Sequence, residues 1–201
     1  MKANPMHADI EIESHPWPPF IPPQAHVLIM GTFPPAPLRW CMNFYYPNRT
    51  NDFWHMMGLI MEGDRYAYYD IQSRSYRLES IKRMLNEKGI ALNDTGHRIR
   101  RLKGNASDKY LEIVEPVDLT ALLSKMPECK NIATTGEKAA SVIASLTDTE
   151  VPAMGCSVQS ASGLTIWRMP STSRAYPLPI DKKAQYYRNL FLHCHIPCFT
   201  A

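Results

Sequence analysis

Three polar residues occupy positions at which an apolar run of the chain begins or ends. Asn51 and Asp52 stand directly before the run F-W-H-M-M, and Asp94 closes the run I-A-L-N-D. Amide and carboxylate groups can position a water molecule and stabilise the positive charge that forms on a sugar as its N-glycosidic bond breaks. The three residues are therefore candidate catalytic groups, although Asn and Asp before a helix serve more often as caps.

Aromatic residues precede this polar pair in the run Phe44-Tyr45-Tyr46. An enzyme that acts on a base within DNA must extrude the base and hold it between aromatic or apolar groups. Each stacked base contributes about 1–3 kcal/mol of binding free energy. The same aromatic residues could instead fill the core beneath a long loop, and the sequence leaves both uses open.

Two further segments have the composition of phosphate contacts. The segment P-S-T-S at 170–173 combines a fixed backbone angle with small hydroxyl donors, a composition that short turns also use. Four basic residues, Arg98, Arg100, Arg101 and Lys103, could neutralise DNA phosphates or form a solvated face. In contrast, T-G-E-K at 135–138 does not complete a phosphate-binding P-loop, because the upstream glycine is missing and alanine follows the lysine.

Composition limits the class of protein. The 201 residues suffice for one domain with a sizeable core, and a net charge of +3 permits a polyanionic partner without requiring one. No apolar run approaches the roughly 20 residues of a membrane span, and the start M-K-A-N-P-M-H lacks a signal-peptide core. Five irregularly spaced cysteines indicate reduced thiols in a cytoplasmic protein, and H-C-H-I-P-C at 193–198 lacks the second ligand pair of a structural zinc site. We therefore predict neither a bound metal nor a cofactor.

Apolar runs that alternate with amphipathic segments predict an α/β fold. The expected strands cover 26–30, 90–94, 131–135 and 164–167, and the expected helices begin near residues 51, 78, 117, 137 and 182. This alternation indicates a mostly parallel sheet covered on both faces, with ligands bound outside the carboxyl ends of its strands. The loops G-T-F-P-P, N-D-T-G, T-G-E-K and M-P-S-T-S-R would then meet at one edge. We expect a single domain over 1–201, with a proline-rich N-terminal wrap at 1–25 and a loop insertion at 61–76.

These motifs resemble those of the uracil-DNA glycosylase superfamily, above all its hypoxanthine-DNA glycosylase and mismatch-specific uracil-DNA glycosylase branches. The resemblance runs from about residue 16 to residue 192. It rests on V-L-I-M before G-T-F-P-P, on Y-Y-P-N-R-T-N-D-F-W, on G-I-A-L-N-D with the downstream Ser107-Asp108, on I-A-T-T-G-E-K-A-A and on M-P-S-T-S-R. It implies a three-layer α/β/α sandwich with a central four-stranded, mostly parallel sheet, and an enzyme that needs no metal.

The resemblance also implies roles for individual residues. The first loop would activate water, Tyr46 would stack on the flipped base, and the last loop would pinch the DNA backbone. The predicted base pocket comprises Gly31, Thr32, Phe33, Pro34, Tyr46 and Thr135. The predicted DNA contacts are Pro170, Ser171, Thr172, Ser173, Arg174, Arg98 and Arg101.

Two positions depart from the pattern of the family. Phe33 stands where the mismatch-specific branch has a water-positioning asparagine, and Met169 stands where the uracil-specialised branch has a histidine. The hypoxanthine branch lacks the first-loop asparagine as well, and by resemblance relies on the asparagine that aligns with Asn51. We therefore predict that Asn51 positions the water, with Asp52 or Asp94 as the next candidates.

The predicted function is that of a monofunctional DNA glycosylase in base excision repair. Its partner would be DNA that carries a deaminated or mismatched base, such as hypoxanthine or uracil, and the protein would act as a monomer without a membrane. Two alternatives remain open at this stage. One is a non-catalytic protein of the same fold that binds damaged or single-stranded DNA, and the other is an enzyme that processes free nucleosides or nucleotides.

Overall fold

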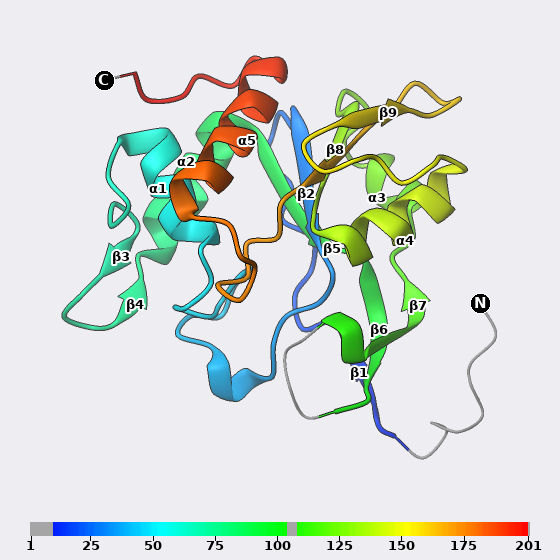
Figure 1. Cartoon of the computed structure of the whole chain (residues 1–201), viewed down its shortest axis with the longest axis horizontal. Helices are drawn as coiled ribbons and strands as arrows, with labels where there is room; N and C mark the ends of the chain where they lie inside the picture. The colour runs from blue at the N-terminus through cyan, green and yellow to red at the C-terminus, as the bar shows by residue number, and fades with distance from the viewer. Residues whose placement is uncertain (1–9, 104–107, 201) are drawn as a thin grey trace.

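The computed structural model describes residues 10–103 and 108–200 and has a five-stranded sheet at its centre (Figure 1). The strand order is β5-β2-β8-β10-β9, in which the first four strands run parallel and β9 is antiparallel to β10. The prediction of four strands therefore has to be corrected to five, because the short, polar edge strand β9 carries no apolar run. The strands are β2 Val27–Gly31, β5 Ile90–Asp94, β8 Asn131–Thr135, β9 Ser157–Gln159 and β10 Thr165–Met169.

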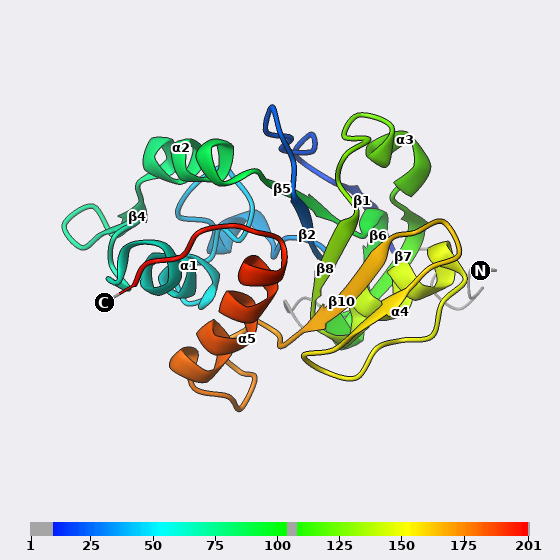
Figure 2. The ribbon, with the colours of Figure 1, turned by 90° about the horizontal axis from the view of Figure 1, so that it is seen from above.

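Helices cover both faces of this sheet (Figure 2). In β2, Val27 and Ile29 belong to one core cluster, whereas Leu28 and Met30 belong to the other, because successive side chains of a strand point to opposite faces. The first cluster includes side chains of α1, α2 and α5, and the second includes side chains of α3 and α4. The helices are α1 Phe53–Glu62, α2 Leu78–Lys88, α3 Leu119–Leu123, α4 Glu137–Thr147 and α5 Ile180–His193.

Two helix ends illustrate how local sequence sets these boundaries. Helix α2 ends at Gly89, whose φ of 64° is left-handed, and a Cβ atom there would lie 2.4 Å from the carbonyl oxygen of Gln24. Helix α3 is shorter than the predicted 117–126, because the chain turns after Leu123 and the backbone N–H of Met126 donates to Leu123, one residue before Pro127.

A second, three-stranded antiparallel sheet lies beside the carboxyl edge of the first and is absent from the sequence prediction. Its order is β1-β6-β7, with β1 Ile12–Ser14, β6 Gly96–Arg101 and β7 Leu111–Pro116. The basic cluster that begins at Arg98 therefore forms a strand, and part of the predicted N-terminal wrap forms β1. A short 3-10 helix, η3 Asp108–Tyr110, precedes β7, and the predicted motif residue Ser107 lies outside the described residues.

The predicted loop insertion at 61–76 contains regular structure. Its first two residues end α1, and a small hairpin follows with strands β3 Tyr69–Asp70 and β4 Ser75–Tyr76. A further 3-10 helix, η2 Pro37–Arg39, lies in the loop after β2. Over the described parts of the chain, no helix is both long and apolar enough to cross a membrane.

Candidate functional site

The loops after β2, β5, β8 and β10 meet at the carboxyl edge of the parallel strands and surround a pocket of about 820 Å³. A pocket of a few hundred to about 1,000 Å³ suits a small organic group, and this edge is where parallel sheets bind ligands. The structure brings all six residues of the predicted base pocket to its wall: Gly31, Thr32, Phe33, Pro34, Tyr46 and Thr135.

Gly31 and Asp94 meet at the base of this pocket. They are register partners at the ends of β2 and β5. A Cβ atom on Gly31 would lie 2.5 Å from Oδ1 of Asp94 and 3.3 Å from the hydroxyl of Tyr46. The missing side chain at Gly31 therefore makes the space that the Asp94 carboxylate occupies. Both residues line the pocket, so a carboxylate oxygen is available at its base.

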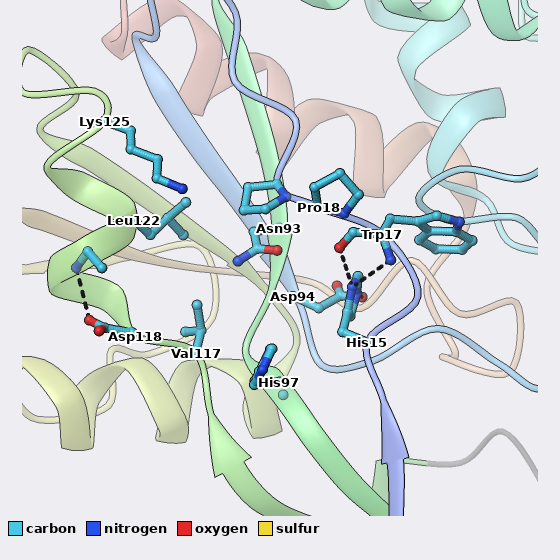
Figure 3. Close-up of a pocket in the computed structure, with 13 residues that line it drawn as sticks. His15, Trp17, Pro18, Asn93, Asp94, His97, Val117, Asp118, Leu122 and Lys125 are labelled. Atoms are coloured by element: carbon cyan, nitrogen blue, oxygen red, sulfur yellow. Dashed lines mark hydrogen bonds and ion pairs between the residues drawn. The ribbon is translucent and has the colours of Figure 1, made fainter.

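The other oxygen of that carboxylate contacts His15, a residue that the sequence analysis did not single out. Nε2 of His15 lies 3.0 Å from Oδ2 of Asp94, and the side chains are 5% and 7% exposed (Figure 3). Burial lowers the pKa of His15, but the hydrogen bond to Asp94 and the charge of that carboxylate outweigh it, so that the pKa is raised. A lone histidine 79 residues before its partner carries no sequence signal of this contact.

Aromatic rings enclose the imidazole of His15. Tyr45 stacks on it at 5.6 Å between ring centroids, and Phe33 and Trp17 present their edges at 5.4 and 5.8 Å. Nδ1 of His15 lies 2.9 Å from the carbonyl oxygen of Trp17 and 3.3 Å from its backbone nitrogen. Both ring nitrogens thus have partners, which a buried imidazole requires.

A second cavity, of about 290 Å³, is lined by both His15 and Asp94 (Figure 3). Asp94 lines both this cavity and the larger pocket, and Asn93 faces only the smaller one. Asp118, which caps the start of α3, and Lys125, just beyond the end of this helix, also line the cavity. Asp94 is therefore in contact with both cavities, and His15 with the smaller one.

Tyr46 is held at the pocket by ring and hydroxyl contacts. Its ring stacks on Phe53 with 3.8 Å between the centroids and an interplanar angle of 17°. Its hydroxyl lies 3.3 Å from Oγ1 of Thr135, and its backbone adopts the left-handed φ of 51°. Tyr46 also lines the pocket, so its aromatic ring stands at the pocket wall.

Asn51 and Asp52 have different environments, although they are neighbours in the chain. Asn51 lines the pocket, but its Oδ1 accepts a hydrogen bond of 2.9 Å from the backbone N–H of Phe53. Asp52 is not among the pocket residues, and its Oδ2 lies 2.8 Å from Nζ of Lys183. Asp52, a predicted catalytic residue, thus forms an ion pair and does not line the pocket, whereas Asn51 does line it.

Most of the last loop borders the pocket as predicted. Ser171, Thr172, Ser173 and Arg174 line it, whereas Pro170 does not, and the carbonyl oxygen of Pro170 accepts a hydrogen bond from Tyr187. The tyrosine hydroxyl fixes the base of the loop at the end of β10 in this way.

The two other predicted DNA contacts, Arg98 and Arg101, are not at the pocket. Arg98 faces Glu115 across the second sheet. Arg101 forms two hydrogen bonds of 2.9 Å with the carboxylate of Glu13 and a third of 3.2 Å with the carbonyl oxygen of Pro34. Both arginines thus pair with glutamates of the second sheet, and Arg101 also contacts the first loop, so that their contact with DNA stays a prediction. The basic residues that line the pocket are instead Arg39, Lys109 and Arg174, and all three are exposed.

Comparisons with known proteins give a match to the fold. No family model and no curated protein matches the sequence. The solution NMR structure of a candidate uracil DNA glycosylase from Methanosarcina acetivorans is similar to this structure, with a TM-score of 0.64 and 22% sequence identity. The match covers 92% of this chain and 99% of that protein. The two chains therefore share an α/β fold over almost their whole length.

Proposed function

We propose that the protein is a monofunctional DNA glycosylase of base excision repair. Its reaction is the hydrolysis of the N-glycosidic bond of a deaminated or mismatched base, such as hypoxanthine or uracil, which leaves an abasic site. The observation that carries the proposal is the pocket at the carboxyl edge of the sheet, where a carboxylate, an amide and an aromatic face converge. Support also comes from the fold shared with the candidate uracil DNA glycosylase of Methanosarcina acetivorans.

The flipped nucleobase enters the pocket and stacks against a face of the Tyr46 ring, which lines the pocket wall. Stacking on this face stabilises the extruded base, as it does in other proteins that bind unpaired bases. Phe53 supports the ring from behind, at 3.8 Å, and limits its movement. Thr135 and the first loop supply hydroxyl and backbone groups that can contact the edge of the base.

Asp94 supplies the negative charge that the reaction requires. As the bond between C1′ of the sugar and the base nitrogen breaks, its electron pair leaves with the base, and the sugar becomes a cation. Water attacks C1′ and transfers a proton to Oδ1 of Asp94, the oxygen that faces Gly31. The carboxylate also stabilises the cation electrostatically, because it lies in a pocket from which much of the solvent is excluded.

Asn51 contributes through its NH₂ group. The side-chain oxygen is engaged by the N–H of Phe53, so the amide nitrogen is the atom left to contact a water molecule or the base. An amide NH₂ donates hydrogen bonds and does not accept a proton at neutral pH. The proton acceptor is therefore Asp94, and Asn51 orients the water molecule or the nucleobase.

The rim of the pocket holds the DNA backbone. Arg39, Lys109 and Arg174 are exposed cations at the pocket, and the loop Ser171–Ser173 adds hydroxyl groups beside them. Phosphates are bound by such groups in most protein–DNA interfaces. The pocket thus has cations at its rim, which can bind the DNA phosphates, and the carboxylate of Asp94 at its bottom, which can stabilise the positive charge of the reacting sugar.

A panel of oligonucleotides tests the function. The protein is incubated with single- and double-stranded DNA that carries uracil, hypoxanthine, xanthine or a G·T mismatch, and abasic sites are detected as alkali-labile breaks. We expect release of at least one base by the wild-type protein and strongly reduced release by Asp94→Asn. Absence of breaks in every substrate, or turnover of free deoxynucleosides without DNA, would overturn the proposal.

A further inference from the structure

We propose that His15 is a positioning residue that orients the carboxylate of Asp94 and, by gaining or losing a proton, sets the negative charge offered to the reacting sugar. The proposal rests on the glycosylase function proposed above and adds a residue and a form of control to it. His15 lies in the N-terminal segment just after β1 and lines the smaller cavity, whereas the residues of the larger pocket begin with Gly31.

The two carboxylate oxygens of Asp94 have different neighbours. Oδ2 is 3.0 Å from Nε2 of His15, whereas Oδ1 is the oxygen that a Cβ atom on Gly31 would meet. The hydrogen bond from the imidazole therefore fixes the rotation of the carboxylate group. It leaves Oδ1 directed toward Gly31 at the end of the neighbouring strand, and both residues line the pocket.

His15 has hydrogen-bond partners for its neutral and for its charged ring. In the neutral ring, Nε2–H donates to Asp94 while Nδ1 accepts from the backbone N–H of Trp17 at 3.3 Å. In the charged ring, Nδ1–H donates to the carbonyl oxygen of Trp17 at 2.9 Å instead. The ring can therefore change its charge without leaving Asp94, and only its contact with the Trp17 backbone changes.

Protonation of His15 changes the net charge of the pair. With imidazolium, the His15–Asp94 pair is neutral, and the carboxylate is a weaker base and a weaker partner for a sugar cation. With neutral imidazole, the pair carries one negative charge. We therefore expect base release to accelerate as pH rises through the titration of His15, whose pKa its partner raises.

Other titratable groups around His15 do not supply this charge. Tyr45 stacks on the ring, but burial raises its pKa far above the neutral range. Arg101, beside Phe33, is paired with Glu13 of β1. Across the smaller cavity stand the exposed residues His97 of β6 and Asp118 and Lys125 near α3, whose charges the solvent screens.

Single-turnover rates of base release between about pH 5 and pH 8 test the proposal, because an imidazole titrates in this interval. The substrate is the best one of the oligonucleotide panel at saturating enzyme. His15→Gln keeps an N–H donor for Asp94 but cannot ionise, and His97→Gln removes the other histidine that lines the smaller cavity. We expect the wild-type and His97→Gln rates to rise by about tenfold over this interval, as removal of one nearby charge allows.

For His15→Gln we expect a rate that changes by less than about twofold over the same interval, since the ionisable group is gone. Its affinity for DNA with an uncleavable target nucleotide should equal that of the wild type. A wild-type pH profile in His15→Gln overturns the role of His15 and leaves the glycosylase proposal intact. Absence of base release by the wild type at every pH overturns the glycosylase proposal instead.

A readout that does not depend on activity covers a variant that fails to fold. The ring resonances of His15 in the wild-type protein are followed by NMR against pH, with Asp94→Asn as the comparison. We expect a lower titration midpoint for His15 in Asp94→Asn, because the raising effect of the carboxylate is removed. An unchanged midpoint means that the two groups do not share a proton-dependent charge, and it overturns the proposal.

Discussion

Lys183 donates a hydrogen bond of 2.8 Å to the carboxylate of Asp52, and no part of the lysine side chain is exposed. The same ammonium group donates to the carbonyl oxygen of Ser173 at 2.8 Å. The backbone N–H of Asp52 donates to the carbonyl oxygen of Thr172. The start of α1, the last loop and α5 are tied together at this point. Because Asn51 precedes Asp52, the contact also sets the distance between two walls of the pocket.

Loss of one partner of this ion pair should therefore destabilise the fold. We expect Asp52→Ala to lower the free energy of unfolding by about 3–5 kcal/mol, because a buried ammonium group is left without its counter-charge. Urea unfolding measures the change, and Lys183→Met with Asp52→Asn should restore part of the loss. The matched control is Glu115→Ala, which breaks an exposed pair with Arg98 and should change the free energy by about 0–1 kcal/mol. Equal effects of the two single variants would contradict the assignment.

Tyr46 provides a test of base stacking. We expect Tyr46→Ala to slow base release by at least about tenfold, since a stacking face is worth about 1–3 kcal/mol. Tyr46→Phe should keep most of the rate, because it preserves the ring against Phe53, although it removes the hydroxyl that lies 3.3 Å from Thr135. Single-turnover assays measure both variants, and thermal unfolding verifies that each is folded. Unchanged release by Tyr46→Ala would remove Tyr46 from base binding.

The strands and loops that build the pocket were predictable because their signals are local. A run such as V-L-I-M is apolar throughout when both faces of a parallel strand are buried, and the glycine that ends it marks the loop. The rule that ligands bind at the carboxyl edge then brings Gly31, Asp94 and Thr135 together. Neither step requires knowledge of distant contacts.

The parts that were missed depend on pairing between distant segments. Strand β1 pairs with β6, with Ser14 opposite Arg98, and this pairing carries His15 to Asp94. The pattern of apolar and polar residues near His15 does not indicate a contact with a residue so distant in the sequence. The pairing of β6 with β1 and β7 also places each arginine of β6 opposite a glutamate from a neighbouring strand, which the sequence order does not indicate.

Variants of Asn51 can distinguish the contribution of its side-chain oxygen to the start of α1 from the contribution of its NH₂ group to the reaction. Asn51→Asp keeps a side-chain oxygen for the N–H of Phe53 but replaces the NH₂ donor, so we expect near-normal stability and at least about tenfold slower base release. Asn51→Ala should lose both, with about 1 kcal/mol of stability gone with the cap. Urea unfolding and single-turnover release together give the comparison. Full activity in Asn51→Asp would show that the NH₂ group has no part in the reaction.

The exposed cations at the pocket should dominate DNA affinity. We expect Arg39→Ala and Arg174→Ala each to weaken DNA binding and to reduce the slope of log affinity against log salt by about 1, as for the loss of one phosphate contact. Arg98→Ala is the matched control, because this arginine faces Glu115 on the second sheet and should leave the slope unchanged. Fluorescence anisotropy at several salt concentrations measures the slope. A larger effect of Arg98→Ala than of Arg174→Ala would support the predicted DNA contact at Arg98 and contradict the dominance of the pocket cations.

The His15–Asp94 pair should also make stability depend on pH, in the direction opposite to activity. The pKa of His15 is raised above 6.5 in the folded protein, chiefly because the hydrogen bond and charge of Asp94 exceed the lowering effect of burial. A group of this kind stabilises the fold fully below its unfolded pKa, and the contribution disappears as pH rises through the folded pKa. The difference in unfolding free energy between the wild type and His15→Gln should therefore be largest at acidic pH and shrink toward alkaline pH. Urea unfolding of both proteins across this range measures it, and a difference that grows with pH would mean that the charged imidazole does not stabilise the fold.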